Sequence, residues 1–156
     1  MRTLARLGTL LVPLAVLLLA KRAGSNAPPG QYVVGTQTAL DTKTGLRWQR
    51  VSSGGVVWAT ALQTCSTITL DGENGFRLPT VRELETIYDV RATTGPLVDK
   101  NVFSAANATI SAGYHWASDQ SGASAYVVSF IPPGQNPYMG TQAKTDFAGA
   151  RCVKGP

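Results

Sequence analysis

The sequence predicts a single α+β domain in which the helices precede most of the strands. Apolar residues recur at helical spacing between positions 58 and 88, whereas short apolar runs typical of strands gather after position 113. Helices and strands that are segregated along a chain in this way are typical of α+β folds. The part that follows the N-terminal segment also has the size of one domain with one hydrophobic core.

The first 23 residues have the pattern of a secretory signal. Arg2 and Arg6 precede an apolar stretch at residues 7–20. This stretch contains a proline and is shorter than the roughly 20 residues that a membrane-spanning helix needs. An uncleaved N-terminal anchor is the alternative, because Lys21 and Arg22 directly follow the apolar stretch and the cleavage site is poorly marked.

The signal segment carries most of the excess positive charge. The whole chain has 14 basic and 9 acidic side chains, but four of the basic ones lie in residues 1–23, so the net charge of the remainder is about +1. A nearly neutral domain gives no support to nucleic-acid binding. Residues 24–31, rich in proline, glycine and small polar residues, are expected to form a flexible linker, and residues 32–156 the folded domain.

A hairpin and a helix are expected at the start of the domain. Turn residues at 42–45 separate the apolar runs 39–41 and 46–49, which predicts a hairpin with Leu46 and Trp48 facing inward. The following helix is predicted by i, i+3, i+4, i+7 spacing of its apolar and small residues, which are Trp58, Ala61, Leu62 and Cys65.

The chain has two cysteines, Cys65 and Cys152. Exported proteins fold in an oxidising compartment, so we expect these cysteines to pair. Two unpaired buried thiols are the alternative.

A second helix is predicted to begin after Pro79, because proline disfavours helical geometry in the residue before it. Thr80 and Glu83 match a capping box, in which each side chain accepts a hydrogen bond from the other residue's backbone amide. The apolar stripe of this helix consists of Val81, Leu84, Ile87 and Tyr88.

The second half of the domain is expected to alternate between loops and strands. Residues 91–113 show no clear period and predict a long surface-packed loop. Residues 114–118 and 125–130 predict two strands, and residues 131–140, rich in proline and glycine, predict another loop. The last strand is expected at residues 150–153.

These segments, taken in order, resemble the bacterial Lcl C-terminal domain, a family of unknown function named after the collagen-like adhesin of Legionella. The resemblance covers roughly residues 38–154. It implies a C-type lectin-like fold, with two helices packed on irregular antiparallel sheets and one disulfide from the first helix, at Cys65, to the final strand, at Cys152. It also implies extracytoplasmic proteins with adhesive or ligand-binding roles and no established chemistry. The segments that carry it are 41–49, the helix ending at Cys65, 75–84, Val98-Asp99 with Phe103, 116–118 and 151–153.

No metal or cofactor is expected. Calcium-dependent sugar binding in C-type lectins relies on an acidic-Pro-Asn type triplet and a Trp-Asn-Asp triplet. This chain has Gln135-Asn136-Pro137 and Trp116-Ala117-Ser118-Asp119, which match neither. No other cluster supplies the six to eight oxygen ligands that calcium prefers.

Enzymatic activity is not expected either. The single histidine, His115, has no zinc-ligand partner or nucleophile motif. Strand alternation places it opposite Tyr114 and Trp116, so we expect a surface or sheet-edge position. The carboxylates of the second helix have structural explanations, since Glu83 caps it and Glu85 can pair with Arg82.

The sequence therefore predicts an exported, non-enzymatic module that binds a carbohydrate or a surface protein through loops between the late strands. Aromatic rings and nearby polar side chains are suited to such contacts. Tyr126 is a further candidate, but for Trp116 and Tyr126 packing in the core or on a sheet face is the favoured interpretation. A structural component of a cell-envelope assembly, without a free ligand, is the alternative function. The candidate ligand-binding residues are Tyr114, Trp116, Asp119, Gln135, Asn136 and Tyr138.

Overall fold

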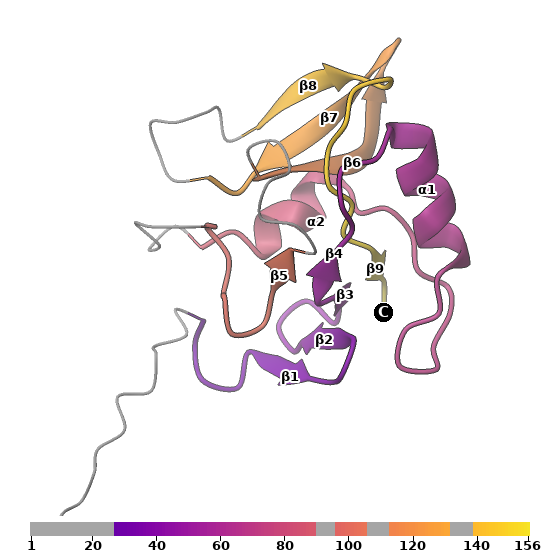
Figure 1. Ribbon diagram of the computed structural model, residues 1–156. Coiled ribbons are helices and arrows are strands. Elements are labelled where there is room, and N and C mark those ends of the chain that lie inside the picture. Colours follow the sequence, from indigo (N-terminus) through magenta and orange to yellow (C-terminus); the bar gives the residue numbers. More distant parts are fainter. Residues whose placement is uncertain (1–26, 90–95, 106–112, 132–138) are drawn as a thin grey trace, which may run out of the picture.

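The computed structural model describes residues 27–89, 96–105, 113–131 and 139–156. These residues form an α+β domain with a sheet at each end and two helices beside and between the sheets (Figure 1). The signal segment expected at residues 1–23 lies outside the described residues. The described part contains no helix that is long and apolar enough to cross a membrane. The helices are α1 (Trp58–Thr67) and α2 (Val81–Thr86), and the strands are β1 (Tyr32–Val34), β2 (Thr38–Asp41), β3 (Arg47–Gln49), β4 (Val51–Ser52), β5 (Ser104–Ala105), β6 (Tyr114–Ser121), β7 (Ser124–Ser129), β8 (Met139–Ala143) and β9 (Val153–Lys154).

The first sheet has the strand order β1-β2-β3-β9 and confirms the predicted hairpin. Strands β2 and β3 pair antiparallel, with Ala39 opposite Trp48. Trp48 is fully buried and Leu46 nearly so, as expected for side chains that face inward. Burial of both residues fixes the register, because a shift by one position would turn these apolar side chains to solvent.

Helix α1 is joined to the first sheet by the expected disulfide. Its buried face carries Ala61 and Cys65, both without exposed area. Cys65 is bonded to Cys152, which immediately precedes β9, and the two Cα atoms are 5.2 Å apart. The alternative of unpaired thiols is therefore wrong.

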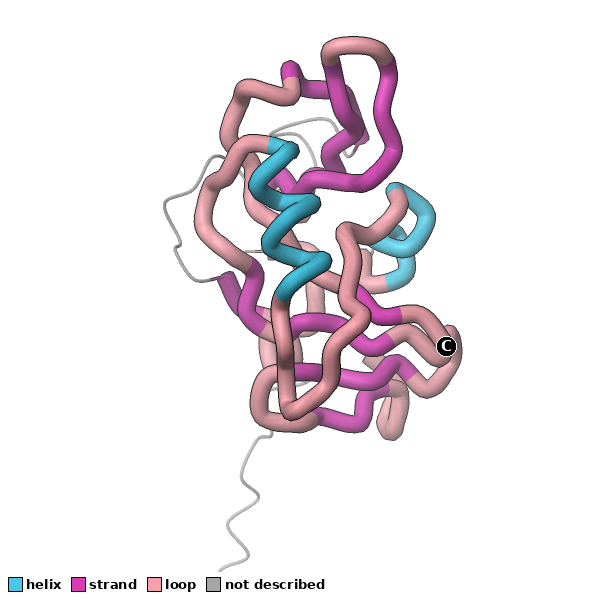
Figure 2. Tube along the Cα trace, turned by 90° about the vertical axis from the view of Figure 1, so that its right-hand side faces the viewer, coloured by secondary structure: helices cyan, strands magenta, loops and turns pink. Residues whose placement is uncertain are grey.

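Helix α2 begins as predicted but ends early. The Thr80–Glu83 capping box is present, with Glu83 Oε2 accepting a hydrogen bond from the Thr80 amide at 2.8 Å. The helix ends at Thr86, so Ile87 packs in the core from just beyond the last turn. Seen from the side in Figure 2, α1 is the longer cyan helix and α2 the shorter one.

The surface loop expected at residues 91–113 is wrong for the part that the structure describes. The backbone of Leu97 bonds to Phe130 and to Asp89, which ties this segment to the end of β7 and to the residues after α2. Strand β5 pairs parallel with β4. The segment contributes core residues without regular periodicity, so its burial depends on contacts with distant parts of the chain. The buried residues here are Leu97, Val98, Asp99, Val102 and Phe103.

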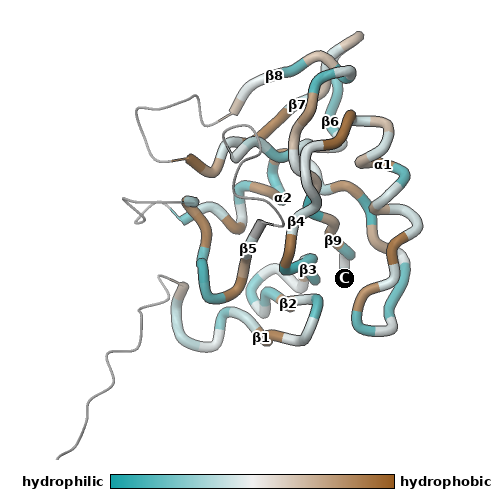
Figure 3. Tube along the Cα trace, in the orientation of Figure 1, coloured by the Kyte–Doolittle hydropathy of each residue, from teal (hydrophilic) through white to brown (hydrophobic). Residues whose placement is uncertain are grey.

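The second sheet has the order β6-β7-β8. Strands β6 and β7 confirm the two strands predicted there, with a register shift between Trp116 and Gln120. Strand β8 begins inside the stretch predicted as a loop, and its pattern of polar and small residues gives little apolar signal (Figure 3). The final strand, β9, is shorter than expected and begins only at Val153.

Candidate functional site

An open hollow lies where α2 packs on the second sheet. We call it the α2–β8 hollow; its volume is about 410 Å³. It combines an aromatic ring, a thioether and charged groups of both signs at the protein surface. The residues that line it are Val81, Arg82 and Glu85 of α2, Asp119 of β6, Tyr126 of β7 and Met139 of β8.

Asp119 is the predicted site residue that the structure places in this hollow. Its side chain is exposed, and its Oδ2 accepts a hydrogen bond from the Val81 amide at 2.7 Å. This contact satisfies one of the free amides at the start of α2, where a negative charge is also favourable. Asp119 therefore has a structural role, while its Oδ1 has no hydrogen-bond partner among the described residues.

Tyr126 forms the aromatic wall of the hollow. Tyr126 is partly buried and packs against the core cluster that contains Leu84 and Val128. The packing interpretation made from the sequence is therefore confirmed, and the ring also lines the hollow.

Helix α2 carries two carboxylates, of which Glu83 forms an ion pair and Glu85 is exposed. Glu83 forms an ion pair with Arg77, and the Arg77 Nη1 to Glu83 Oε2 distance is 2.8 Å. The Arg77 guanidinium, followed by the hydrogen bonds at Thr80, lowers the pKa of Glu83. The ion pair expected between Arg82 and Glu85 is not formed among the described residues. Both of these side chains are exposed and line the hollow.

The other described candidates lie elsewhere. Trp116 is fully buried, and its Nε1 donates a hydrogen bond to the Val56 carbonyl at 2.7 Å. Tyr114 is partly buried and packs against the same cluster as Trp116. Trp116 thus lies in the core, and neither ring lines the hollow.

The remaining three candidates, Gln135, Asn136 and Tyr138, lie outside the described residues. Met139 is the first described residue after them, and it lines the hollow. The chain therefore rejoins the described structure at the rim of the hollow.

His115 is buried, so the expected surface or sheet-edge position is wrong. Its Nδ1 lies 3.1 Å from the Gly113 carbonyl oxygen, and its ring meets the Phe130 ring edge-on at 5.1 Å. Burial, followed by the nearby charge of Arg151, lowers the pKa of His115 to about 3. The side chains of β6 alternate between its two faces as predicted. Both faces are covered, however, since the neighbouring residues Trp116 and Ala117 belong to two different core clusters.

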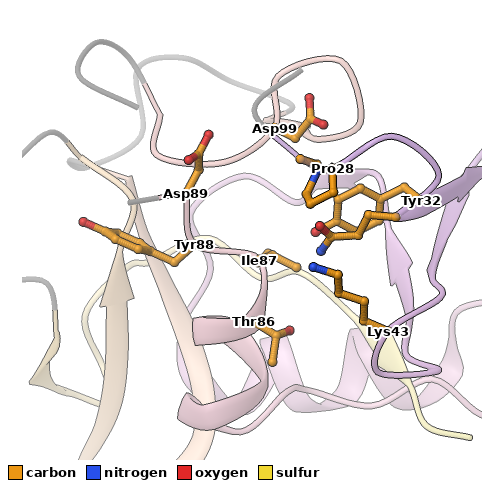
Figure 4. A pocket seen from close by; sticks show the side chains of 10 residues that line it. Pro28, Tyr32, Lys43, Thr86, Ile87, Tyr88, Asp89 and Asp99 are labelled. Atoms are coloured by element: carbon orange, nitrogen blue, oxygen red, sulfur yellow. The ribbon is translucent and has the colours of Figure 1, made fainter. Parts of the chain in front are cut away.

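A second concavity, which we call the Tyr32 pocket, was not predicted from the sequence. It has a volume of about 220 Å³ and lies between the segment before β1 and the residues after α2 (Figure 4). Burial, followed by the charges of Asp41, Asp99 and Asp89, raises the pKa of the Tyr32 hydroxyl. The pocket joins segments from distant parts of the chain, and no local sequence pattern marks it. Its lining is Ala27, Pro28, Gln31, Tyr32, Lys43, Thr86, Ile87, Tyr88, Asp89 and Asp99.

The hollow presents exposed polar groups and an aromatic ring. In the described residues there is no group of three or more histidine, cysteine, aspartate or glutamate side chains that could hold a metal ion. Both cysteines are consumed by the disulfide.

Comparison with known proteins identifies the family. No curated protein matches the chain. The family described as Lcl C-terminal domain matches residues 37–154, a range that includes every helix and strand of the structure from β2 to β9. The chain belongs to the Lcl C-terminal domain family.

Proposed function

We propose that this protein is an exported, non-enzymatic recognition module with a C-type lectin-like fold, and that the α2–β8 hollow binds a carbohydrate or a protein on a surface. The observation that carries the proposal is the composition of this hollow. An aromatic ring and exposed charged groups share one concave surface, and Met139, the first described residue after three of the predicted binding residues, lines it.

The chemistry of the hollow suits ligands with both apolar and polar faces. Tyr126 and Met139 offer apolar surface, Asp119 and Glu85 offer hydrogen-bond acceptors, and Arg82 offers donors. Sugar rings and peptide side chains both combine such faces. A few polar groups that converge around an apolar surface are typical of ligand sites.

The location and the fold have separate support. A buried disulfide is typical of proteins that fold outside the reducing cytosol, which supports export. A disulfide that links the first helix to the chain just before the last strand, in a domain of two described helices and antiparallel sheets, supports a C-type lectin-like arrangement. The fold alone implies no activity.

The proposal is tested by presenting the oxidised protein to an array of glycans, polysaccharides and extracellular matrix proteins. Asp119→Asn and Glu85→Gln are the informative variants, because each removes a charge and keeps an oxygen acceptor. In particular, Asp119→Asn retains an acceptor for the Val81 amide, so α2 keeps its contact. We expect each variant to weaken selective binding by about tenfold, as lost charge-assisted hydrogen bonds do.

Asp146→Asn is the matched control, since Asp146 is exposed and does not line the hollow. Its binding should equal that of the unmodified protein. Binding that is unchanged in both hollow variants would reject the site. An array without any selective binding would reject free-ligand recognition and favour a structural role in an envelope assembly.

A further inference from the structure

Among the described residues, strand β8 forms an open edge of the second sheet. It pairs with β7 at five consecutive positions, from Ser124 opposite Ala143 to Val128 opposite Met139. At the opposite edge of this sheet, the segment around Gly149 covers β6, since the Trp116 amide donates to the Gly149 carbonyl at 2.9 Å. No strand among the described residues pairs with the outer side of β8.

The backbone groups that face this open edge can be assigned. The Lys144 amide donates to the Ala123 carbonyl at 3.1 Å, which places position 144 in a hydrogen-bonded pair with β7. Hydrogen-bonded positions alternate along an antiparallel strand, so Met139 and Thr141 direct their amide and carbonyl groups away from β7. The Ala143 carbonyl is already occupied, because it accepts from the Asp146 amide.

Two edge strands, β1 of the first sheet and β8 of the second, differ in how well they are protected against pairing with a further strand. Strand β1, an edge of the first sheet, has only three residues. Strand β8 has five residues, with neither a proline nor a charged side chain, and its register is regular. Short length, proline and charge are the devices by which proteins block strand addition. Strand β1 is protected by its short length, whereas β8 is longer and carries no proline or charge within the strand.

The α2–β8 hollow adjoins this edge and indicates what a bound strand would carry. Met139 belongs to both features, so a strand added along β8 would pass beside the hollow. Side chains two positions apart on such a strand point to the same face. One of them would meet the apolar surface of Met139 and Tyr126. The net charge of the hollow favours a basic side chain at the other position, because Asp119 and Glu85 carry two negative charges against the single positive charge of Arg82.

We propose that β8 receives an extended segment of a partner polypeptide as an added strand, and that this segment places an apolar and a basic side chain, two positions apart, over the α2–β8 hollow. This inference rests on the proposed function and specifies that the partner is a polypeptide. Backbone hydrogen bonds to Met139 and Thr141 supply affinity, and the hollow supplies specificity, as in other cases of strand addition.

The test selects binders from a displayed library of random short peptides on the full-length oxidised protein. We expect the selected peptides to share the apolar and basic pattern. Thr141→Pro removes an outward-facing amide, a position where proline is compatible with an edge strand. It should weaken the selected peptides by about tenfold or more through lost backbone hydrogen bonds. Val34→Pro, at the edge of the first sheet, is the matched control and should leave their affinity unchanged.

A second measurement needs no variant. Amide hydrogen exchange at Met139 and Thr141 should be fast in the free protein and should slow when the selected peptide binds. Failure to select any peptide, peptide affinity that Thr141→Pro leaves unchanged, or unprotected amides in the complex would each overturn strand addition. A glycan that binds the unmodified protein and Thr141→Pro equally would also overturn it, while leaving the recognition function intact.

Discussion

His115 is held neutral in the native protein, because burial lowers its pKa from 6.5 to about 3. In the unfolded chain the imidazole regains its ordinary pKa, so below pH 6.5 the unfolded state binds a proton that the native state does not. Stability is therefore expected to fall as the pH decreases from about 6.5 toward 3. Between pH 7 and pH 5 the loss should be about 2 kcal/mol, given 1.36 kcal/mol per unit of pKa.

Urea unfolding at pH 7, 6 and 5 measures this loss. His115→Gln, which does not titrate, is the control and should show a flatter dependence over the same range. The carboxylates whose pKa values are lowered, Asp71, Glu73 and Glu83, lose their stabilising charge only at lower pH and do not affect this window. Equal slopes for the variant and the unmodified protein would contradict the assignment to His115.

Arg151 links the final segment of the chain to residues 49–50 and to Ser104 through hydrogen bonds to backbone carbonyls. Its side chain is buried and donates to the carbonyls of Gln49, Arg50 and Ser104 at 2.7, 2.6 and 3.0 Å. Burial lowers the pKa of Arg151 to about 9. A lysine ammonium lacks the planar fork that reaches several carbonyls at once. Arg151→Lys should therefore destabilise the protein by about 3 kcal/mol, because buried carbonyls lose their donors.

Chemical denaturation measures this effect, and Arg50→Lys is the matched control. Arg50 also donates to backbone carbonyls, those of Gly35, Thr36 and Val102, but it is only half-buried, so water can replace its contacts. We expect a loss of about 1 kcal/mol for the control. Equal losses in the two variants would show that burial of Arg151 is not the cause.

At the scale of elements, α2 depends on its N-terminal contacts. With six residues it is far shorter than the isolated helices that are stable in water. The Thr80 hydroxyl accepts from the Glu83 amide at 3.2 Å. Thr80→Ala should cost about 1 kcal/mol in the free energy of unfolding, whereas Thr80→Ser keeps the acceptor and should cost less. Thermal unfolding of the two variants distinguishes them, and equal melting temperatures would contradict this role of the hydroxyl.

Elements whose signals are local could be predicted from the sequence. The hairpin around residues 42–45 and the capping box at Thr80 each depend on residues within a few positions of each other, so their patterns are visible in the chain. Strand β8 depends on pairing with β7 for its structure, and its own residues carry almost no apolar alternation. The buried segment 97–103 likewise depends on distant partners.

The same distinction applies to the candidate site. Asp119 could be selected as exposed and polar, but its contact with Val81 could not, because 38 positions separate the two residues. Alternation predicts the correct face of β6 for His115 but the wrong environment, because it gives the direction of a side chain and not what covers each face. The hollow itself combines residues from α2, β6, β7 and β8, an arrangement that only the tertiary structure reveals.

At the scale of the whole molecule, two core clusters meet at β6 and the disulfide reinforces one of them. Cys65 and Cys152 belong to the cluster with Trp116 and Leu78, while Trp48 and Leu84 belong to the other. The bond closes a loop with a sequence separation of 87 residues. By the chain-entropy model, closing a loop of this length raises the free energy of the unfolded state by about 4.6 kcal/mol.

That contribution is large beside the 5–15 kcal/mol by which domains are typically stable. We therefore expect Cys65→Ala/Cys152→Ala to unfold at a much lower urea concentration than the oxidised protein, with a loss of about 4.6 kcal/mol in the free energy of unfolding. Reductant should shift the unfolding of the unmodified protein toward that of the double variant and should leave the double variant itself unchanged. If the oxidised and fully reduced proteins unfold at the same urea concentration, the covalent link does not stabilise this fold, and its two clusters are sufficient without it.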